Sequence, residues 1–307
     1  MKGRTLPDEL AFLRNRNLPQ HTSDASMDGK TCIVTGATSG VGLETSRRLA
    51  KGGAHLVMVC RNQAKALAVR DSIIARWPVP VDIVCADFSR LAEVRDAAEQ
   101  ILATYPRIDV LINCAGMYST VARHTPEGFE TVFCVNHLAS FLFTLLLLPR
   151  LQESAPARII QVNSEGHRFG GLDLDDIDWR KRRYTGLRGY GASKTAQLLT
   201  VWELAEQLRG TGVTINAVHP GDVKTNIGNN NGWLYRTFSR LVTRRMLRDP
   251  AIAGDALYYH AADPSLRAVS GKFYHLTVEE KPAKHALDRD LGKRVYALSL
   301  KMTGLAG

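Results

Sequence analysis

Paired cysteines and metal-ligating motifs are both missing from this 307-residue sequence. Its cysteines form no C-x-x-C pair and no histidine spacing suits zinc, so we predict neither a disulfide framework nor a metal site. Four of the five lie in apolar stretches that read as strands, which is typical of small reduced core residues in a cytoplasmic protein. The five are Cys32, Cys60, Cys85, Cys114 and Cys134.

The chain also has little that would place it across a membrane. Residues 1–28 are polar and lack the apolar core of a secretory signal. The longest apolar run, 138–149, is shorter than the ~20 residues that span a bilayer. We therefore expect a soluble, cytoplasmic protein.

Negative charge is scarce relative to positive charge, with 40 Lys and Arg against 30 Asp and Glu and a net charge of +10. Most of the excess lies in residues 151–307. A positive field suits phosphate-bearing or acidic partners, or an anionic membrane surface. The basic residues are not interleaved with aromatic residues and no nucleic-acid-binding motif appears, so we expect no nucleic acid partner.

From Lys30 onward, short apolar stretches alternate with helical patterns. This alternation is typical of a parallel sheet covered by helices on both faces. We predict an α/β protein with a Rossmann-type doubly wound parallel sheet in a single domain, residues 29–307, preceded by an N-terminal extension, residues 1–28. The predicted strands are 31–36, 55–61, 81–86, 109–114, 158–163 and 213–218, and the predicted helices are 40–52, 63–76, 90–104, 126–151, 188–210, 250–262 and 284–300.

A glycine-rich turn follows the first predicted strand. Gly36, Gly40 and Gly42 leave backbone N–H groups accessible where a helix begins, and the helix dipole favours an anion such as a pyrophosphate there. Ligands of doubly wound sheets bind beyond the carboxyl ends of the strands, and small or polar residues follow each predicted strand. Beyond the turn these are Arg61-Asn62, Asp87-Phe88, residues 113–116, Asn163-Ser164 and residues 219–221.

The expected nucleotide is NADP(H). No acidic residue occurs between Glu44 and Asp71, where a dinucleotide-binding unit places an acid for a free ribose 2′-hydroxyl. The second strand instead ends at Arg61, whose guanidinium suits a 2′-phosphate, and Lys65 and Arg70 add positive charge. The alternative is that Arg61 is a solvated turn residue.

Tyr190 and Lys194 lie four residues apart at the start of a helical pattern, so they share one helix face. A free tyrosine has a pKa of about 10 and exchanges its proton poorly near neutrality. An ammonium ~4 Å away would lower the pKa by roughly three units, to near 7. Ser164, the only serine between residues 155 and 189, ends the fifth strand, where its hydroxyl can polarise a carbonyl.

As a set, these elements resemble the classical short-chain dehydrogenase/reductase family over about residues 30–275. Four segments, 60–62, 162–167, 172–176 and 218–221, are similar to its retinol-dehydrogenase and WW-domain-oxidoreductase branch, which tends to reduce retinal and other apolar carbonyls with NADPH. The sequence departs from the family at Asn163, where serine is common. The matching motifs are T-G-x-x-x-G-x-G at 35–42, Asp87, N-x-A-G at 113–116, V-N-x-x-x-x-F at 135–141, Ser164, Y-x-x-x-K at 190–194, and Pro220-Gly221 followed by Thr225.

The resemblance implies a role for each matched residue. Tyr190 would be the general acid/base, Ser164 would bind the substrate oxygen, and Lys194 would hold the nicotinamide ribose and lower the pKa of the tyrosine. Asn136 would complete the catalytic set by anchoring a proton-relay water. The residues implied in binding NADPH or NADP+ are Gly36, Thr38, Ser39, Gly40, Val41, Gly42, Arg61, Asn62, Asp87, Phe88, Asn113, Ala115, Gly116, Tyr190, Lys194, Pro220, Gly221, Val223 and Thr225.

Two stretches are candidate walls of a substrate pocket. Residues 165–189 hold an acidic run followed by a basic run, which indicates either a charged solvent loop or one wall. A predicted lid region, 222–249, includes residues 232–248, which pair a stripe of arginines with an apolar face. That pattern fits a lid or packing helix over an apolar pocket, or peripheral contact with an anionic membrane.

The expected function is hydride transfer between NADP(H) and a carbonyl or alcohol of a hydrophobic retinal-, steroid- or ketone-like substrate. Two alternatives stay open: a C=C reductase of the same fold, of the protochlorophyllide type, and a catalytically silent NADP(H)-binding protein. A homodimer through helices 126–151 and 188–210 is also open, although core packing explains their apolar faces equally well.

Overall fold

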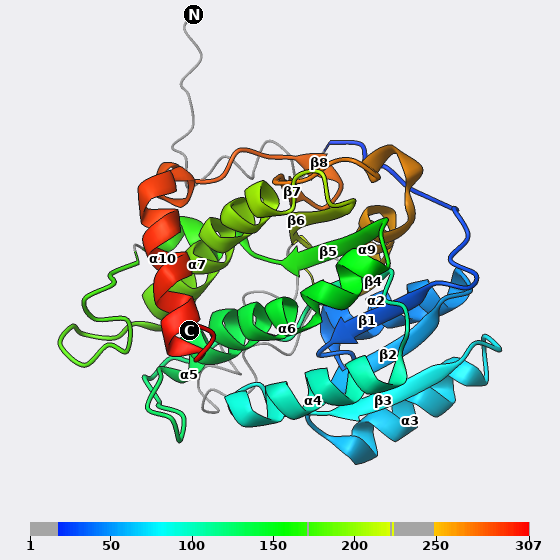
Figure 1. Ribbon diagram of the computed structural model, residues 1–307, viewed down its shortest axis with the longest axis horizontal. Coiled ribbons are helices and arrows are strands. Elements are labelled where there is room, and N and C mark those ends of the chain that lie inside the picture. Colours follow the sequence, from blue (N-terminus) through cyan, green and yellow to red (C-terminus); the bar gives the residue numbers. More distant parts are fainter. Residues whose placement is uncertain (1–17, 171, 222, 224–248, 307) are drawn as a thin grey trace, which may run out of the picture.

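The computed structural model describes residues 18–170, 172–221, 223 and 249–306 of the chain. Within them one sheet runs in the order β3-β2-β1-β4-β5-β6-β7-β8, parallel throughout except for the antiparallel pair β7–β8. Figure 1 shows this order from β3 near the bottom to β8 at the top. The strands are β1 (Thr31–Thr35), β2 (His55–Cys60), β3 (Val81–Cys85), β4 (Val110–Asn113), β5 (Ala157–Val162), β6 (Val213–His219), β7 (Phe273–His275) and β8 (Val278–Glu279).

Helices cover both faces of the sheet, and each face has its own apolar core. In β1, Ile33 packs into the core shared with α4, α6 and α7, whereas Cys32 and Val34 pack into the core shared with α2, α3 and α9. The long helix α10 lies against α7 (Figure 1). The predicted doubly wound α/β fold is confirmed. The helices are α2 (Gly40–Lys51), α3 (Gln63–Ile74), α4 (Leu91–Thr104), α5 (Thr131–Phe133), α6 (Ala139–Glu153), α7 (Gly186–Gln207), α9 (Pro250–Ala262) and α10 (Arg289–Met302).

The fourth predicted helix begins later than expected. A turn occupies its predicted start: Gly128 has φ +89° and its N–H donates to the carbonyl of Thr125 at 2.9 Å. The Glu130 side chain then accepts from the backbone N–H groups of Val132 and Phe133, which caps the helix at Thr131. Strands β7 and β8 were not predicted, because segments of three and two residues are too short to show an alternating pattern.

The helical stretch Thr131–Glu153 is long and apolar enough to cross a membrane by length and composition. It exceeds the apolar run seen in the sequence because Thr131–Phe133, a π-helical turn (Cys134–Leu138) and α6 are continuous. However, 72% of its most apolar window is buried inside the fold, where Leu142 and Phe143 are fully buried. These contacts are those of a core helix.

The described end of the predicted N-terminal extension lies against the domain. Met27 is buried, and the Tyr258 hydroxyl of α9 donates to the carbonyl of Ala25 at 2.5 Å. Gln20 Oε1 accepts from both the backbone N–H and the hydroxyl of Thr277, between β7 and β8. Residues 18–28 therefore join the far edge of the sheet to β1.

All five cysteines are unpaired, and four of them are fully or partly buried. Burial raises the pKa of Cys60 and of Cys114 to about 12, so their thiols are poor nucleophiles at neutral pH. Cys85 departs from the core position that we expected and is exposed, because β3 is an edge strand of the sheet.

Candidate active site

The carboxyl ends of β1, β2 and β4 meet at one edge of the sheet. The hydroxyl oxygen of Thr35, at the end of β1, accepts from the backbone N–H groups of Cys114 at 3.0 Å and Ala115 at 2.9 Å, just after β4. The N–H of Gly36 donates to the carbonyl of Val59 on β2 at 2.9 Å. The glycine-rich turn is therefore fixed to the two neighbouring strand ends.

The glycine-rich turn has the geometry of an anion cradle. Gly36 has φ +69°, and a Cβ there would lie 2.9 Å from the Cα of Ala115. A Cβ at Gly42 would lie 2.4 Å from the carbonyl oxygen of Gly36, so the turn and α2 approach closely only because both are glycine. Ser39 precedes α2 without a side-chain capping bond, which leaves the first-turn N–H groups for a ligand. The turn fits a diphosphate.

Arg61 offers an exposed cation directly after β2. Its side chain is 69% exposed, and its Nη1 lies 3.9 Å from Asp87 Oδ2, too far for a hydrogen bond. Asn62 instead caps α3, since its Oδ1 accepts from the backbone N–H of Lys65 at 2.8 Å. The Arg61 guanidinium is therefore available to an anion at this edge of the sheet.

Two of the residues implied in cofactor binding turn their side chains into the protein. Phe88 is buried with its ring centroid 5.7 Å from that of Phe143, and Asn113 Nδ2 donates to the Thr144 hydroxyl at 2.8 Å. Any cofactor contact at these two positions would come from the backbone. Thr225 lies outside the described residues.

Asn136 lies in the π-helical turn that precedes α6. Its Oδ1 accepts from the N–H of Met117 at 2.7 Å, and its Nδ2 donates to the Met117 carbonyl at 3.1 Å and the Ser193 hydroxyl at 2.9 Å. The side chain thus fastens the loop after β4 to α7. Its amide is committed to protein partners, so this geometry assigns Asn136 a positioning role.

The Ser164 hydroxyl and the Tyr190 ring lie beside each other at the end of β5, both next to Gly166. Ser164 Oγ accepts from the N–H of Gly166 at 3.0 Å, at the start of the 3-10 helix Glu165–Phe169. A Cβ at Gly166 would lie 2.7 Å from Cε1 of Tyr190, so the phenol reaches Ser164 only because residue 166 is glycine. The structure brings together the two residues that the sequence assigned to the substrate oxygen.

Lys194 is buried and held by two acceptors. Its Nζ donates to the carbonyl of Val162 at 3.0 Å and to Gln197 Oε1 at 2.9 Å. Gln197 Oε1 also accepts from Asn163 Nδ2 at 3.2 Å, and Gln197 Nε2 donates to the carbonyl of Asn136. An ammonium carries three donors, so one remains for a ligand after these two described contacts. The departure at Asn163 is part of this network.

The pKa of Tyr190 differs from our expectation. Desolvation raises it to about 12, although the neighbouring Ser164 hydroxyl partly offsets the increase. Lys194 Nζ lies 5.7 Å from the centroid of the Tyr190 ring, and burial lowers the pKa of Lys194 to about 8. Desolvation therefore outweighs the ammonium in the protein alone, and Tyr190 is protonated at neutral pH.

The 165–189 segment is folded around Asp176 rather than spread in solvent. Its carboxylate accepts from the backbone N–H groups of Arg180, Lys181 and Arg182, which turns the basic run back over the acidic run. Trp179 is buried in this turn. The predicted lid helix, 232–248, lies outside the described residues.

Comparison with known proteins places this architecture in one family. The model of the short chain dehydrogenase family matches residues 30–175 and 177–232. The chain belongs to the short-chain dehydrogenase family. As a member it is an oxidoreductase that uses a nicotinamide dinucleotide, NAD or NADP. It is 37% identical to human retinol dehydrogenase 13 over 92% of this chain and 87% of the relative. It is 34% identical to the human WW domain-containing oxidoreductase over 89% of this chain and 68% of that protein.

Solved structures share the fold. An uncharacterised protein from Mycobacterium paratuberculosis superposes with a TM-score of 0.74 at 28% identity, over 93% of this chain and 98% of that one. A short chain dehydrogenase from Shigella flexneri, solved in complex with NADP, superposes with a TM-score of 0.67 at 22% identity, over 83% and 99% of the two chains. The branch similarity seen in the sequence is thus confirmed by the relatives, and the fold by the structures.

Sequence reasoning missed the residues that position the catalytic group. Gln197 lies three positions after Lys194, one helical turn along, which was the available signal that its amide could reach the ammonium. Gly166 and Met117 gave no comparable signal, because their partners come from segments distant in the sequence. A cavity of about 770 Å³ lies elsewhere, beside the amino ends of β5 and β6.

Proposed function

We propose that this protein transfers hydride between NADP(H) and a carbonyl or alcohol carbon of a hydrophobic substrate. The observation that carries the proposal is the grouping of the Ser164 and Tyr190 side chains beside the buried Lys194, at the edge of the sheet that also holds the glycine-rich turn. A protonated phenol and a serine hydroxyl together can polarise and protonate one carbonyl oxygen.

The pKa values favour Tyr190 as a general acid in carbonyl reduction. With a pKa of about 12 the phenol carries its proton at neutral pH and can donate it to the substrate oxygen. Ser164 holds that oxygen by its hydroxyl. Lys194, with a pKa of about 8, is mostly charged at pH 7 and stabilises the phenolate left behind. The bound reduced nicotinamide would supply the hydride to the carbonyl carbon.

NADP rather than NAD is proposed because of Arg61. Its guanidinium is 69% exposed and has no described partner closer than Asp87 at 3.9 Å. A phosphate is the ligand that a planar guanidinium binds best, through two parallel hydrogen bonds. No acidic residue occupies the strand end where an NAD-specific site places one.

A retinal-like or other apolar carbonyl is the proposed substrate class. The relatives named as retinol dehydrogenases match nearly the whole chain. Segment 165–189 is proposed as one wall of the substrate pocket, and it contains the buried Ile177 and Trp179. The arginine-rich segment 232–248 is proposed as the second wall from its sequence pattern alone.

Cofactor oxidation across a matched substrate panel tests this function. NADPH and NADH are each supplied with retinal, steroid ketones, aliphatic aldehydes and small polar ketones. We expect NADPH oxidation with the apolar carbonyls and little with the polar ones. NADPH binding without turnover of any compound would instead support a catalytically silent protein.

A further inference from the structure

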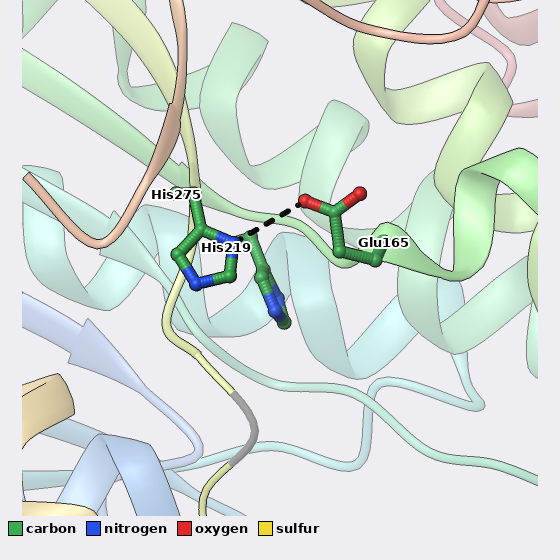
Figure 2. A group of neighbouring side chains, drawn as sticks. All are labelled: Glu165, His219 and His275. Atoms are coloured by element: carbon green, nitrogen blue, oxygen red, sulfur yellow. Dashed lines mark ion pairs between the residues drawn. The ribbon is translucent and has the colours of Figure 1, made fainter. Parts of the chain in front are cut away.

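A second group of ionisable side chains lies at the ends of β5, β6 and β7, next to the catalytic residues. Glu165 follows β5, His219 ends β6 and His275 ends β7, so the three come from neighbouring parallel strand ends (Figure 2). Each is at least 95% buried. One potential ligand atom from each lies within 4.8 Å of the other two. The two imidazole rings meet edge to face with centroids 4.9 Å apart.

Arg168 orients two carboxylates toward His275. Its Nε contacts Glu165 Oε2 at 2.5 Å, and an Nη contacts Glu280 Oε1 at 2.5 Å. The remaining oxygens, Glu165 Oε1 and Glu280 Oε2, each lie 3.7 Å from Nδ1 of His275. Arg168 thus pairs with both carboxylates, and one oxygen of each lies near the imidazole of His275.

Two of the facing atoms lack hydrogen-bond partners. Glu165 Oε1 and His275 Nδ1 are both buried without one, and their separation of 3.7 Å is too long for a hydrogen bond. Donor atoms around a tetrahedral ion with 2.0–2.1 Å bonds lie roughly 3.3–3.4 Å apart, so a few tenths of an ångström would suffice to close this pair on a cation. Buried polar atoms are rarely left unpaired without a reason.

The charge of the group also favours a cation. Glu165 and Glu280 both pair with the guanidinium of Arg168, so two carboxylates share one cationic side chain in a buried site.

We propose that Glu165, His219 and His275 bind a divalent cation of the zinc type, with Glu280 as a second carboxylate ligand. Imidazole nitrogen and carboxylate oxygen form a donor set that suits Zn²⁺, and Arg168 is the outer partner that fixes both carboxylates. This site could not be predicted from the sequence because its residues lie on three separate segments.

The ion would stabilise the strand ends next to the catalytic residues and would take no part in the reaction. Glu165 directly follows Ser164, and His219 directly precedes Pro220 of the segment implied in cofactor binding. One ion would therefore connect the ends of β5, β6 and β7. This proposal does not depend on the nature of the substrate.

Metal titration of the full chain tests the proposal. Chelator-treated protein is titrated with Zn²⁺ by calorimetry and with Co²⁺ by absorption, and its melting temperature is followed. We expect one ion per chain, a higher melting temperature with Zn²⁺, and a Co²⁺ spectrum without thiolate charge-transfer bands, which excludes the cysteines as ligands.

Two variants and one control locate the site. H275Q is expected to weaken Zn²⁺ binding by about 100-fold or more, since loss of even an outer partner costs ~10–100-fold. E280Q is the second variant if H275Q does not fold, as judged by circular dichroism, and should weaken binding at least 10-fold. The control is H55Q, which removes an imidazole paired with Asp82 on the β2–β3 edge and should bind as the unmodified protein does.

Absence of stoichiometric Zn²⁺ and Co²⁺ binding to the unmodified chain would overturn the proposal. Unchanged affinity in a folded H275Q or E280Q would overturn it as well.

Discussion

The functional site lies along the carboxyl ends of the strands, and its two halves are built in different ways. At the ends of β1 and β2 the nucleotide half relies on backbone geometry, with close-packed glycines at Gly36 and Gly42 and an exposed Arg61. At the ends of β5 to β7 the catalytic half relies on buried polar side chains that bond one another, among them Lys194 and Gln197. The nucleotide half is built to bind a charged ligand. The catalytic half is a hydrogen-bonded network that positions a proton donor.

This difference predicts how each half responds to substitution. Changes in the nucleotide half should alter which cofactor binds and leave the chemistry intact. Changes to the Ser164 and Tyr190 hydroxyls in the catalytic half should lower turnover and leave cofactor affinity nearly intact, because these hydroxyls act on the substrate oxygen.

Removing the Tyr190 hydroxyl should have the largest effect. Y190F should lower kcat by about 10³-fold, since a positioned general acid contributes ~10²–10⁴-fold, while NADPH affinity stays nearly unchanged. Steady-state kinetics and fluorescence titration of NADPH measure the two quantities. The control is Y184F, whose hydroxyl donates to the carbonyl of Ser119 at 3.3 Å and should matter little. Near-normal turnover in Y190F would contradict the mechanism.

Reversing the charge at Arg61 should separate the two halves. R61D should shift the ratio of kcat/KM for NADPH over NADH toward NADH by about 100-fold, because a charge-assisted hydrogen bond is worth ~1.5–3 kcal/mol and repulsion adds to its loss. The kcat with saturating NADH should not fall. R209D is the matched control, an equal charge change at an exposed arginine paired with Glu206. An unmoved ratio would show that Arg61 does not select the cofactor.

The sequence predicted these two halves unequally. The nucleotide half could be predicted because it depends on short sequence patterns: glycines spaced within one turn, and an arginine at a strand end. In the catalytic half only the residues with a motif, Ser164, Tyr190 and Lys194, could be assigned. Their supporting partners, Gln197 and Gly166, depend on how β5 and α7 meet, which local patterns do not encode.

The pKa of Tyr190 shows the same limit. A charge at an assumed distance predicted a pKa near 7, whereas desolvation of the half-buried phenol raises the pKa to about 12. Desolvation depends on the whole surroundings of a group and not on one neighbour. Strands β7 and β8 were not predicted because segments this short show no alternating pattern in the sequence.

Gln197 provides a test of the network in the catalytic half. Q197L removes the acceptor of the Lys194 ammonium and of Asn163 Nδ2, and should lower kcat about 30-fold, since leaving a buried charged group unsatisfied costs ~1–3 kcal/mol or more. Because Gln197 acts through Lys194, the pH dependence of kcat should move to lower pH as well. The control is Q207L on the same helix, where the amide accepts from Tyr296. A loss of activity without a shifted pH profile would show that Gln197 acts through packing and not through Lys194.

The smallest effect should come from pH. Burial lowers the pKa of Lys194 to about 8, so its ammonium is present below that value and is lost as the pH rises through it. Carbonyl reduction should therefore fall by about 4-fold between pH 7 and pH 8.5, because the phenolate formed from Tyr190 loses its neighbouring positive charge. Initial rates at saturating NADPH measure this, and a rate that rises over the interval would contradict the assignment.

Isotope transfer tests the central claim of hydride transfer most directly. NADPH carrying deuterium at C4 of the nicotinamide, on the transferred face, is incubated with the protein and a substrate from the apolar carbonyl panel, and the product is examined by mass spectrometry and NMR. The account predicts one deuterium on the former carbonyl carbon, now bearing a hydroxyl. Deuterium on a neighbouring carbon with the carbonyl retained, or a product without deuterium, would contradict it.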